Sequence, residues 1–315
     1  MSGAPVVRVV VPARNAADTL PRTLDGLAAQ ELEEAFEVLV VDDGSLDATA
    51  EIAQAHPVVS RVVPGGRGPG AARNAGAAGA TAPALAFTDA DCVPSPGWLA
   101  AGLRALEGAD LVQGRVDPDP AAARHPWDRT VSVTAAWGLF ESANLFVDRA
   151  WFERLGGFSD GIAAGSRPLA EDVFFGWDMR VAGGRTAFAG AARVEHAVFT
   201  RRATAFVAER WRLRHFPEIA RRAPGIRETF LRRRVFLPGP TAAFEAAVLG
   251  TVAAAVVRSP LPLAAALPYV RRLFRTARQW PRYPTWRLVA VTVAADAVGT
   301  AALVSGSVEQ RTLVL

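Results

Sequence analysis

The chain has 315 residues, half of them apolar, and a net charge of +4, which suits one large domain or one domain with an extension. All 35 basic residues are arginine, so the lysine-dependent chemistries of P-loop NTPases, protein kinases and pyridoxal phosphate enzymes are excluded. The single cysteine, Cys92, excludes an internal disulfide and a zinc site built from cysteines.

Buried strands and helices alternate along the first part of the chain. Apolar runs predict strands, and leucine or alanine spacing predicts the helices between them. The expected strands are 6–11, 36–41, 58–63 and 84–88, and the expected helices are 18–30, 47–55 and 71–80. This alternation predicts an α/β protein with a doubly wound, mostly parallel sheet. The apolar run 6–11 is short, contains Arg8 and is not accompanied by a cleavage-site pattern. We therefore interpret it as a strand rather than a signal peptide, and we expect a cytoplasmic protein.

The pattern changes after Pro94. Residues 98–106 predict a helix, 111–116 a strand, and 117–136 an irregular polar segment. A short strand, a helix and a Gly-Gly turn are expected within 141–158. A further helix is expected to open at Glu171-Asp172 and to close at Gly183-Gly184, because glycine commonly ends helices. One or two strands then lead to His196.

Polar residues cluster where the predicted strands end. The clusters are Arg14-Asn15, Asp42-Asp43, residues 67–74, and Asp89 with Asp91. In doubly wound sheets, ligands bind outside the carboxyl ends of the strands. We therefore expect these clusters to converge on one crevice.

Asp89-Ala90-Asp91 directly follows a predicted strand. On an extended segment, residues two apart point the same way, so the two carboxylates would repel each other unless a cation lay beside them. Carboxylate oxygens at a strand end suit Mg²⁺ or Mn²⁺ carrying a substrate diphosphate. The alternative interpretation is a pair of helix caps or a solvated turn.

Four further candidates each have a structural alternative. The Asp42–Ser45 turn could bind a ribose or a base N–H, or only cap a helix. The glycine-rich segment 65–76 could hold phosphate at a helix N-terminus, or be a flexible loop; Ala71 breaks the dinucleotide fingerprint. Glu171-Asp172 could supply a general base, or only complement the helix dipole. His196 could be a metal ligand or a core residue.

Five segments, 9–15, 38–49, 68–99, 144–158 and 170–184, occur in the order seen in glycosyltransferase family 2. The chain resembles that family over roughly residues 6–200. The resemblance implies a GT-A fold and an inverting, metal-dependent transfer of a sugar from a nucleotide-sugar donor to a hydroxyl acceptor. It implies Mg²⁺ or Mn²⁺ as the cofactor.

The resemblance also implies roles for individual residues. Asp172 would be the catalytic base, with Glu171 beside it. The metal would be held by Asp89, Asp91 and His196, with Asp91 as the more direct ligand. The donor would lie against Pro12, Arg14, Asn15, Asp42, Asp43, Arg73 and Asp89, with Asp43 nearest the base and Arg73 near the diphosphate. The acceptor side would include Asn144, Gly157 and Trp177.

The chain also departs from the family pattern. Family members often place an acid two positions after the Glu-Asp pair, where this chain has Phe174. The QxxRW motif of processive polysaccharide synthases is absent from the sequence, so we do not expect a long-chain synthase.

The C-terminal part differs in charge and hydropathy. Residues 201–287 contain 18 arginines and four acidic residues, a net charge of +14, and the remainder carries −10. Two apolar stretches, 235–257 and 288–304, are each broken by one acid, Glu245 or Asp296. This composition favours a membrane-associated tail over a helical pack against the catalytic domain. Nucleic acid is disfavoured, because no recognition motif lies among the arginines.

These observations predict a glycosyltransferase domain over 1–200 and a basic, apolar helical tail over 201–315. The tail would place the enzyme at the inner face of the cell membrane, near a lipid-linked or cell-envelope glycan acceptor. Two alternatives stay open: a catalytically inert binding or scaffold protein of the same fold, and a sugar nucleotidyltransferase. A sugar nucleotidyltransferase would need a glycine-rich loop with arginine or lysine after the first strand, and the sequence there, "VPARNAADTL", contains no glycine.

Overall fold

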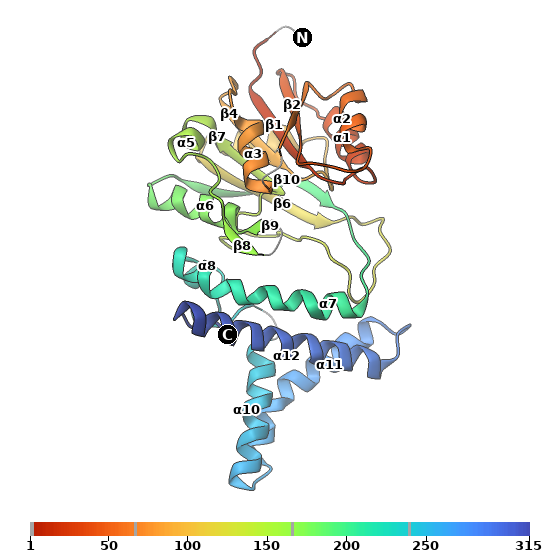
Figure 1. Cartoon of the computed structure of the whole chain (residues 1–315), viewed down its shortest axis with the longest axis vertical. Helices are drawn as coiled ribbons and strands as arrows, with labels where there is room; N and C mark the ends of the chain where they lie inside the picture. The colour runs from red at the N-terminus through yellow and green to blue at the C-terminus, as the bar shows by residue number, and fades with distance from the viewer. Residues whose placement is uncertain (1–2, 66–67, 165–166, 239–240) are drawn as a thin grey trace. The chain divides into compact units, whose positions relative to one another are not determined.

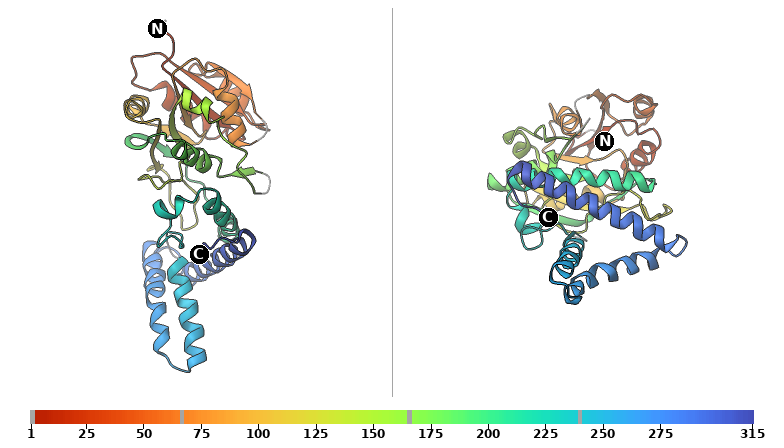
Figure 2. Two further views of the ribbon diagram at one scale, coloured as in Figure 1. Left: turned by 90° about the vertical axis from the view of Figure 1, so that its left-hand side faces the viewer. Right: turned by 60° about the horizontal axis from the view of Figure 1, so that its bottom comes forward.

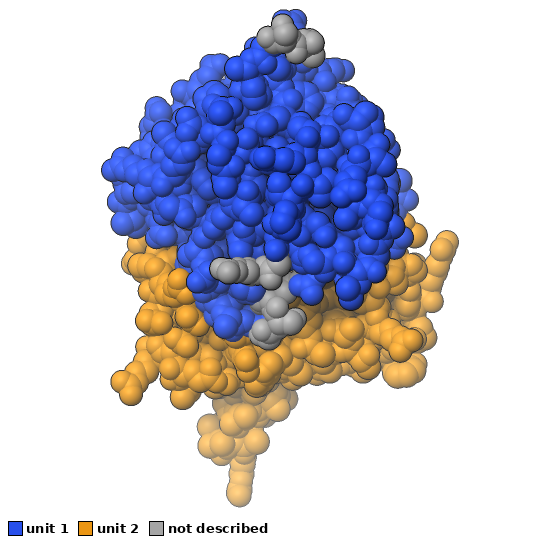
Figure 3. Space-filling model, turned by 45° about the horizontal axis from the view of Figure 1, so that its top comes forward, with its two compact units in different colours: residues 1–122, 130–198 blue, residues 123–129, 199–315 orange. Residues whose placement is uncertain are grey.

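The structure is a computed structural model that describes residues 3–65, 68–164, 167–238 and 241–315 (Figure 1). The chain divides into two compact units, coloured separately in Figure 3. Unit 1 comprises Met1–Ala122 and Thr130–Val198, and unit 2 comprises Ala123–Arg129 and Phe199–Leu315.

The N-terminal half of unit 1 is a parallel α/β arrangement. Strands β1 (Val7–Ala13), β2 (Phe36–Asp42), β3 (Arg61–Pro64) and β4 (Ala84–Thr88) alternate with α1 (Leu20–Ala28), α2 (Thr49–Ala55) and α3 (Pro69–Ala77). β1 pairs in parallel with β2 and with β4, and β3 continues the parallel order beyond β2. The carboxyl ends of these strands therefore meet at one edge, as the sequence predicts.

The second half of unit 1 extends the same sheet. Its elements are β5 (Cys92–Pro94), α4 (Trp98–Leu106), β6 (Leu111–Pro118), β7 (Asn144–Asp148), α5 (Arg149–Arg154), β8 (Ile162–Ala164), β9 (Arg167–Leu169), α6 (Glu171–Val181) and β10 (Thr186–His196). The strand order is β3-β2-β1-β4-β7-β6-β10-β5, and β8 pairs with β9 separately. β7 is antiparallel to β4 and β6, and β10 is parallel to β6 and antiparallel to β5.

Both faces of the sheet are covered. Val9 and Val11 of β1 join one core cluster with residues of α1 and α4, and Val10 between them joins a second cluster with residues of α3, α5 and α6. Successive strand residues point to opposite faces, so an unbroken apolar run requires apolar partners on both sides. The predicted doubly wound α/β sheet is confirmed.

Several local predictions differ from the structure. The third strand begins at Arg61 rather than at residue 58. The second helix begins at Thr49 because the Asp47 carboxylate accepts from the Thr49 amide at 3.1 Å and from Ala17 at 3.1 Å. The Asp89–Asp91 segment forms a turn between β4 and β5, so its two side chains do not share a strand face. Gly66 and Arg67 of the glycine-rich segment lie outside the described residues.

Unit 2 is helical. Its elements are α7 (Ala203–Glu209), η1 (Arg210–His215), α8 (Phe216–Arg222), α9 (Ile226–Thr229), α10 (Thr241–Val257), η2 (Leu261–Ala266), α11 (Leu267–Gln279) and α12 (Thr285–Gln310). In Figure 2, α10 and the chain that returns through η2 into α11 form a hairpin, with α10 packed mainly against η2. By length and composition, α12 is long and apolar enough to cross a membrane. A third of its most apolar 18-residue segment is buried within the fold.

Candidate active site

The ends of β1 and β2 are joined by side chains from both loops. The backbone amide of Asn15 donates to the Ser45 hydroxyl at 3.0 Å, and Asn15 adopts a left-handed conformation with φ of 50°. Asp43 is buried, and its Oδ1 accepts from the Gly68 amide at the start of α3 at 3.3 Å. The structure thus brings three of the predicted clusters to one place. Arg14, beside Asn15, is exposed, whereas Pro12 is partly buried within β1.

Arg73 connects the aspartate motif to the Glu-Asp pair. Its guanidinium is almost fully buried and donates to Asp89 Oδ1 at 2.6 Å and to Glu171 Oε1 at 3.1 Å. Its Nε is buried without a hydrogen-bond partner. Burial alone would lower the pKa of Arg73, but Asp89, Glu171 and Asp172 outweigh burial and raise it. The buried cation therefore neutralises the first aspartate of the motif directly.

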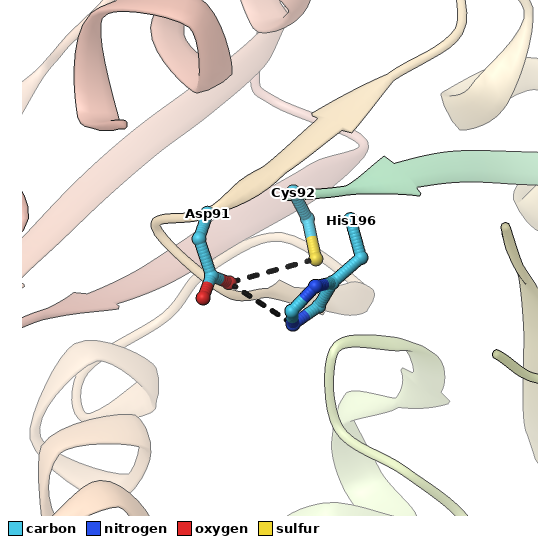
Figure 4. Close-up of side chains that lie close together, drawn as sticks. All are labelled: Asp91, Cys92 and His196. Atoms are coloured by element: carbon cyan, nitrogen blue, oxygen red, sulfur yellow. Dashed lines mark hydrogen bonds and ion pairs between the residues drawn. The ribbon is translucent and has the colours of Figure 1, made fainter. Parts of the chain in front are cut away.

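Asp91 lies beside the end of β10 (Figure 4). Pairing of β5 with β10 sets His196 opposite Cys92, and His196 Nε2 lies 3.6 Å from Asp91 Oδ1. The ligand atoms of Asp91, Cys92 and His196 all lie within 4.8 Å of one another. A backbone hydrogen bond also holds Asp91 close to His196, since the Ala197 amide donates to the Asp91 carbonyl at 2.8 Å. Asp91 and His196 thus converge as the sequence predicts.

The donor set suits a hard divalent cation. His196 Nδ1 lies 2.6 Å from the Ala197 carbonyl, which only accepts, so Nδ1 donates there and Nε2, on the side of Asp91, is the ring nitrogen that could bind a cation. Burial, with Asp89 and Asp91, raises the pKa of the Cys92 thiol well above its ordinary value, which disfavours a thiolate ligand. A carboxylate and an imidazole without a thiolate fit Mn²⁺ or Mg²⁺ better than a soft metal.

The Glu-Asp pair is held at the start of α6 by unusual backbone geometry. Ala170, the residue before the helix, has φ of 67°, a left-handed conformation that costs a non-glycine residue about 1 kcal/mol or more. Asp172 Oδ2 accepts from the Ser142 amide at 3.1 Å and lies 3.3 Å from the Ser142 hydroxyl. Asp172 remains partly exposed, whereas Glu171 is buried against Arg73.

Both carboxyls of the pair are harder to ionise than ordinary acids. Burial and the Asp172 charge raise the pKa of Glu171 to about 7, although Arg73 opposes the shift. Burial also raises the pKa of Asp172, while Arg73 and the Ser142 amide favour its charged form. A carboxylate with a raised pKa is a better proton acceptor than an ordinary aspartate, which is the property a general base requires.

Sequence reasoning missed two residues at this site. Ser142 supplies both hydrogen bonds to Asp172 described above, and Glu141 next to it has its pKa raised to about 7, mainly by burial and also by Asp172. The sequence carried one signal for them: Glu141 and Ser142 lie one residue before β7, which pairs with β4, the strand that leads into the aspartate motif. Nothing in its spacing pointed to Asp172, which lies thirty residues further along the chain.

The three residues expected on the acceptor side occupy different environments. Asn144 is fully buried, and its amide group bonds to Trp98 Nε1, the Arg115 carbonyl and the Ala192 carbonyl, each at 2.8 Å. It therefore ties the sheet together and is enclosed by it. Trp177 is partly buried and donates from Nε1 to the Gly138 carbonyl at 2.9 Å. It thereby anchors the loop that carries Glu141.

Gly157 forms a tight turn against α3. Its φ is 73°, and a Cβ there would lie 2.5 Å from Asn74 Oδ1, so only glycine fits without a shift. Asn74 bonds to both the amide and the carbonyl of Phe158, at 2.8 Å each. The Phe158 ring lies 5.8 Å from the Arg73 guanidinium, so this turn packs an aromatic ring beside the buried cation.

Comparison with known proteins identifies this arrangement. The profile described as "Glycosyl transferase family 2" matches residues 8–174. The chain belongs to this family.

Two characterised relatives illustrate the range of the similarity. Glycosyltransferase AglE of Haloferax volcanii is 31% identical over 177 residues, 51% of this chain and 58% of the relative. Validoxylamine A glucosyltransferase of Streptomyces hygroscopicus subsp. jinggangensis is 34% identical over 164 residues, 48% of this chain and 38% of the relative. The matched region therefore spans 58% and 38% of the length of these two relatives, less than two thirds of each.

Solved structures share the fold, which is of the GT-A type. The mannosyltransferase PcManGT of Pyrobaculum calidifontis, in complex with GDP-Man and Mn²⁺, superposes with a TM-score of 0.54 at 22% identity, covering 98% of this chain and 88% of that chain. S. aureus TarS 1-349 in complex with UDP superposes with a TM-score of 0.51 at 18% identity, covering 97% and 92%.

Proposed function

We propose that this family member is an inverting, metal-dependent glycosyltransferase that moves a sugar from a nucleotide-sugar donor to a hydroxyl acceptor. The observation that carries the proposal is the convergence of Asp91 with His196 Nε2, 3.6 Å apart, beside the Arg73-linked Asp89 and Glu171. The neighbours in complex with GDP-Man and Mn²⁺ or with UDP support a nucleoside diphosphate donor and a divalent cation.

Residues at the strand ends would bind the donor. Asp43, with a carboxylate fixed by the Gly68 amide, would accept from the base, and Asp42 and Asn15 would border the ribose. Arg73 is committed to two carboxylates, so we assign it a positioning role: it holds Asp89 and Glu171 in place. Asp91 and His196 would hold Mg²⁺ or Mn²⁺, with Asp89 nearby. The bound ion would neutralise charge on the departing diphosphate.

Asp172 would act as the catalytic base. Its Oδ2 is oriented by Ser142, and its raised pKa favours taking a proton from the acceptor hydroxyl as that oxygen attacks the anomeric carbon. A single attack from the face opposite the leaving group inverts the anomeric carbon. Glu171 would not reach the acceptor, since it is buried against Arg73 and fixes the start of α6.

We further propose that residues 201–315 form a basic tail that holds residues 1–200 at the inner face of the cell membrane, beside a lipid-linked or cell-envelope glycan acceptor. The charge of +14 over residues 201–287 supports this location, because anionic lipid attracts arginine by about 1 kcal/mol each. The apolar surface of unit 2 supports it independently.

The donor can be identified by measuring release of nucleoside diphosphate. Purified full-length protein would be incubated with Mn²⁺ and with UDP-, GDP- or dTDP-linked sugars, and donor binding would be measured in parallel by calorimetry. We expect metal-dependent release from one donor, lost in Asp91→Ala and in Asp172→Asn. Glu34→Gln, at an exposed position before β2, is the control.

The two variants separate the proposed roles. Asp91→Ala should lose both metal-dependent donor binding and release, whereas Asp172→Asn should bind the donor normally and lose only turnover. If no donor binds in the presence of either metal, the proposal is wrong and an inert scaffold of the same fold is the better description.

A further inference from the structure

Unit 2 carries an apolar surface that its own fold does not cover. We call α10, η2 and α11 together the apolar hairpin. Its exposed large side chains are Val248, Leu249, Val252, Val256, Val257, Leu261, Leu263, Leu267, Val270 and Phe274. Leu261 is 81% exposed and Val256 is 76% exposed, near the end where α10 leads into η2. A contiguous apolar surface of this kind marks an interaction site.

The apolar hairpin is a built element. Gly250 of α10 lies so close to η2 that a Cβ would be 2.5 Å from the Pro262 carbonyl oxygen. At the opposite end, the rings of Phe244 and Tyr269 pack 5.2 Å apart. Tyr269 then donates to Asp296 of α12 at 2.9 Å, and Arg272 donates to the same carboxylate at 2.8 Å. The hairpin is therefore anchored at its base, and its exposed end is preformed.

The long helix α12 is already occupied by unit 2. Its buried face includes Asp296, whose charge is compensated by Arg272. A Cβ on Gly306 would collide with the carbonyl of Arg214 in η1, and one on Gly299 would lie 3.3 Å from Leu213. A helix bound this closely to its neighbours would have to leave them, and expose a paired carboxylate, in order to cross a membrane.

The chemistry of the apolar hairpin matches lipid. Between Ala246 and Val270 the only charged residue is Arg258, and the exposed side chains are almost all aliphatic. Beyond that stretch, α11 carries the exposed arginines Arg271, Arg275 and Arg278. Aliphatic residues bordered by arginines suit acyl chains below anionic headgroups.

Arg258 limits how deeply the hairpin enters. The charge-free part of α10, residues 246–257, is about 18 Å long at 1.5 Å per residue, close to the roughly 15 Å thickness of one hydrocarbon leaflet. An upright hairpin would put the Arg258 guanidinium near the bilayer centre, at a cost of about 3 kcal/mol. A tilted hairpin lets this long side chain reach the phosphates.

We infer that the apolar hairpin is the membrane-binding element: it lies tilted in one leaflet of an anionic bilayer, while α12 stays within unit 2. This inference rests on the membrane location proposed above, and it names the element and the depth. It commits unit 2 to lying on the membrane rather than spanning it.

Vesicle flotation tests the inference with the full-length chain. Vesicles of phosphatidylcholine with phosphatidylglycerol would be compared with phosphatidylcholine alone. Leu261→Asp and the double variant Val256→Asp with Val257→Asp should each lower binding to anionic vesicles at least tenfold. Leu46→Asp is the matched control, because Leu46 is 94% exposed in unit 1, and it should bind as the native protein does.

A depth measurement separates tilted insertion from spanning. Leu261→Cys and Leu46→Cys, each labelled with an environment-sensitive fluorophore, would be titrated with the same vesicles; the native Cys92 is buried. The Leu261 label should shift to the blue and be quenched by brominated lipid with bromines near the headgroup more than at the chain end. Strongest quenching at the chain end would overturn the tilted geometry.

The outcomes distinguish this inference from the proposed function. Undiminished vesicle binding by the Asp variants would overturn the hairpin as the contact while leaving membrane binding standing. If the native chain does not bind vesicles but forms a dimer, and Leu261→Asp is a monomer, the apolar hairpin would instead bind a second copy of the chain. Nucleoside diphosphate release in detergent should be normal in every hairpin variant, so loss of donor use would be a separate failure.

Discussion

Arg73 accounts for much of the electrostatics of the site, because one buried cation serves two carboxylates from different parts of the chain. The sequence raised the question of how Asp89 and Asp91 could lie side by side without severe repulsion. The structure answers it in part before any metal is considered: Asp89 pairs with Arg73 at 2.6 Å, and Asp91 turns toward His196. Under the proposed function, only the second aspartate would then be left for a bound cation.

Asp172→Asn tests the base and its protonation. We expect kcat to fall by about 10² to 10⁴, the usual contribution of a general base, with donor KM little changed. In the native enzyme, burial raises the pKa of Asp172, and only the deprotonated form accepts a proton. The ascending limb of kcat against pH should therefore lie above the ordinary carboxylate range of about 4. An ascending limb at about pH 4 would contradict this assignment.

The raised pKa of Glu141 should make the folded protein less stable at high pH than at low pH. Its pKa is about 7 in the folded protein against 4.5 ordinarily, so the native state binds more protons between these values and its stability falls as pH rises through this window. Glu141→Gln removes the cost and should stabilise the protein by about 1 to 3 kcal/mol above pH 7.

The measurement is urea unfolding at pH 5 and at pH 8, with Glu34→Gln at an exposed position as the control. The gain from Glu141→Gln should be largest at pH 8 and small at pH 5. An equal gain at both values would attribute the effect to packing rather than to ionisation.

At the scale of elements, the sequence predicted what local periodicity encodes and failed where distant segments meet. The strands β1, β2 and β4 fall within a residue or two of the expected ranges, because unbroken Val and Leu runs are buried on both faces. The site residues on these strand ends, Asp43, Asp89 and Asp91, could therefore be predicted. The convergence of Asp91 and His196 needed the family resemblance, since it depends on β5 pairing with β10.

Other features could not have been predicted. The contacts of Asn144 with three distant partners depend on the order β7-β6-β10, which adjacent sequence does not encode. Residues Asp89–Asp91 were expected to be extended, with both carboxylates on one face. They form a turn instead, because the chain must reverse between β4 and β5, which starts at Cys92. Hydropathy marked residues 235–257 and 288–304 as similar stretches, yet the large side chains of residues 248–257 are mostly exposed, whereas α12 buries one face that includes Leu288, Asp296 and Leu303.

The left-handed conformation of Ala170, just before α6, can be tested by substitution. Glycine adopts its φ of 67° without a steric cost, whereas a β-branched residue there is strongly strained. Ala170→Gly should keep activity within about twofold. Ala170→Val should cost roughly 1–3 kcal/mol and lower kcat/KM at least tenfold, because the following Glu171-Asp172 pair would move.

Thermal unfolding and steady-state kinetics measure both effects. Ala182→Val is the matched control, since Ala182 ends the same helix at an ordinary φ of −74°. An active Ala170→Val enzyme with native stability would show that the left-handed residue does not fix the pair.

At the scale of the whole molecule, charge and apolar surface divide between the two ends of the sequence. The +14 segment lies within residues 201–287, and the motif acids lie before residue 173. Catalysis and membrane binding should therefore be separable by mutation. Exposed arginines act through screened, long-range attraction, whereas the apolar hairpin acts through burial, so the two parts of membrane binding should respond differently to salt.

The double variant Arg275→Glu with Arg278→Glu tests this division. Both residues are exposed on α11, and losing two attractions of about 1 kcal/mol each should weaken binding to anionic vesicles by tenfold or more at low salt. The difference from the native chain should shrink as salt rises. Arg61→Glu with Arg104→Glu, exposed in unit 1, is the control. Equal losses in both double variants would indicate a general charge effect.

The position of β10 has a consequence for how the enzyme is made. β10 is the last strand of unit 1 to leave the ribosome, yet it is inserted between β6 and β5 and carries His196 at its end. Until residues 186–196 emerge, β5 lacks the strand it pairs with and Asp91 lacks its histidine. The nascent chain therefore cannot complete the proposed metal site until nearly all of unit 1 has been synthesised, and a chain stalled before Thr186 would present the edge of β6 to other strands.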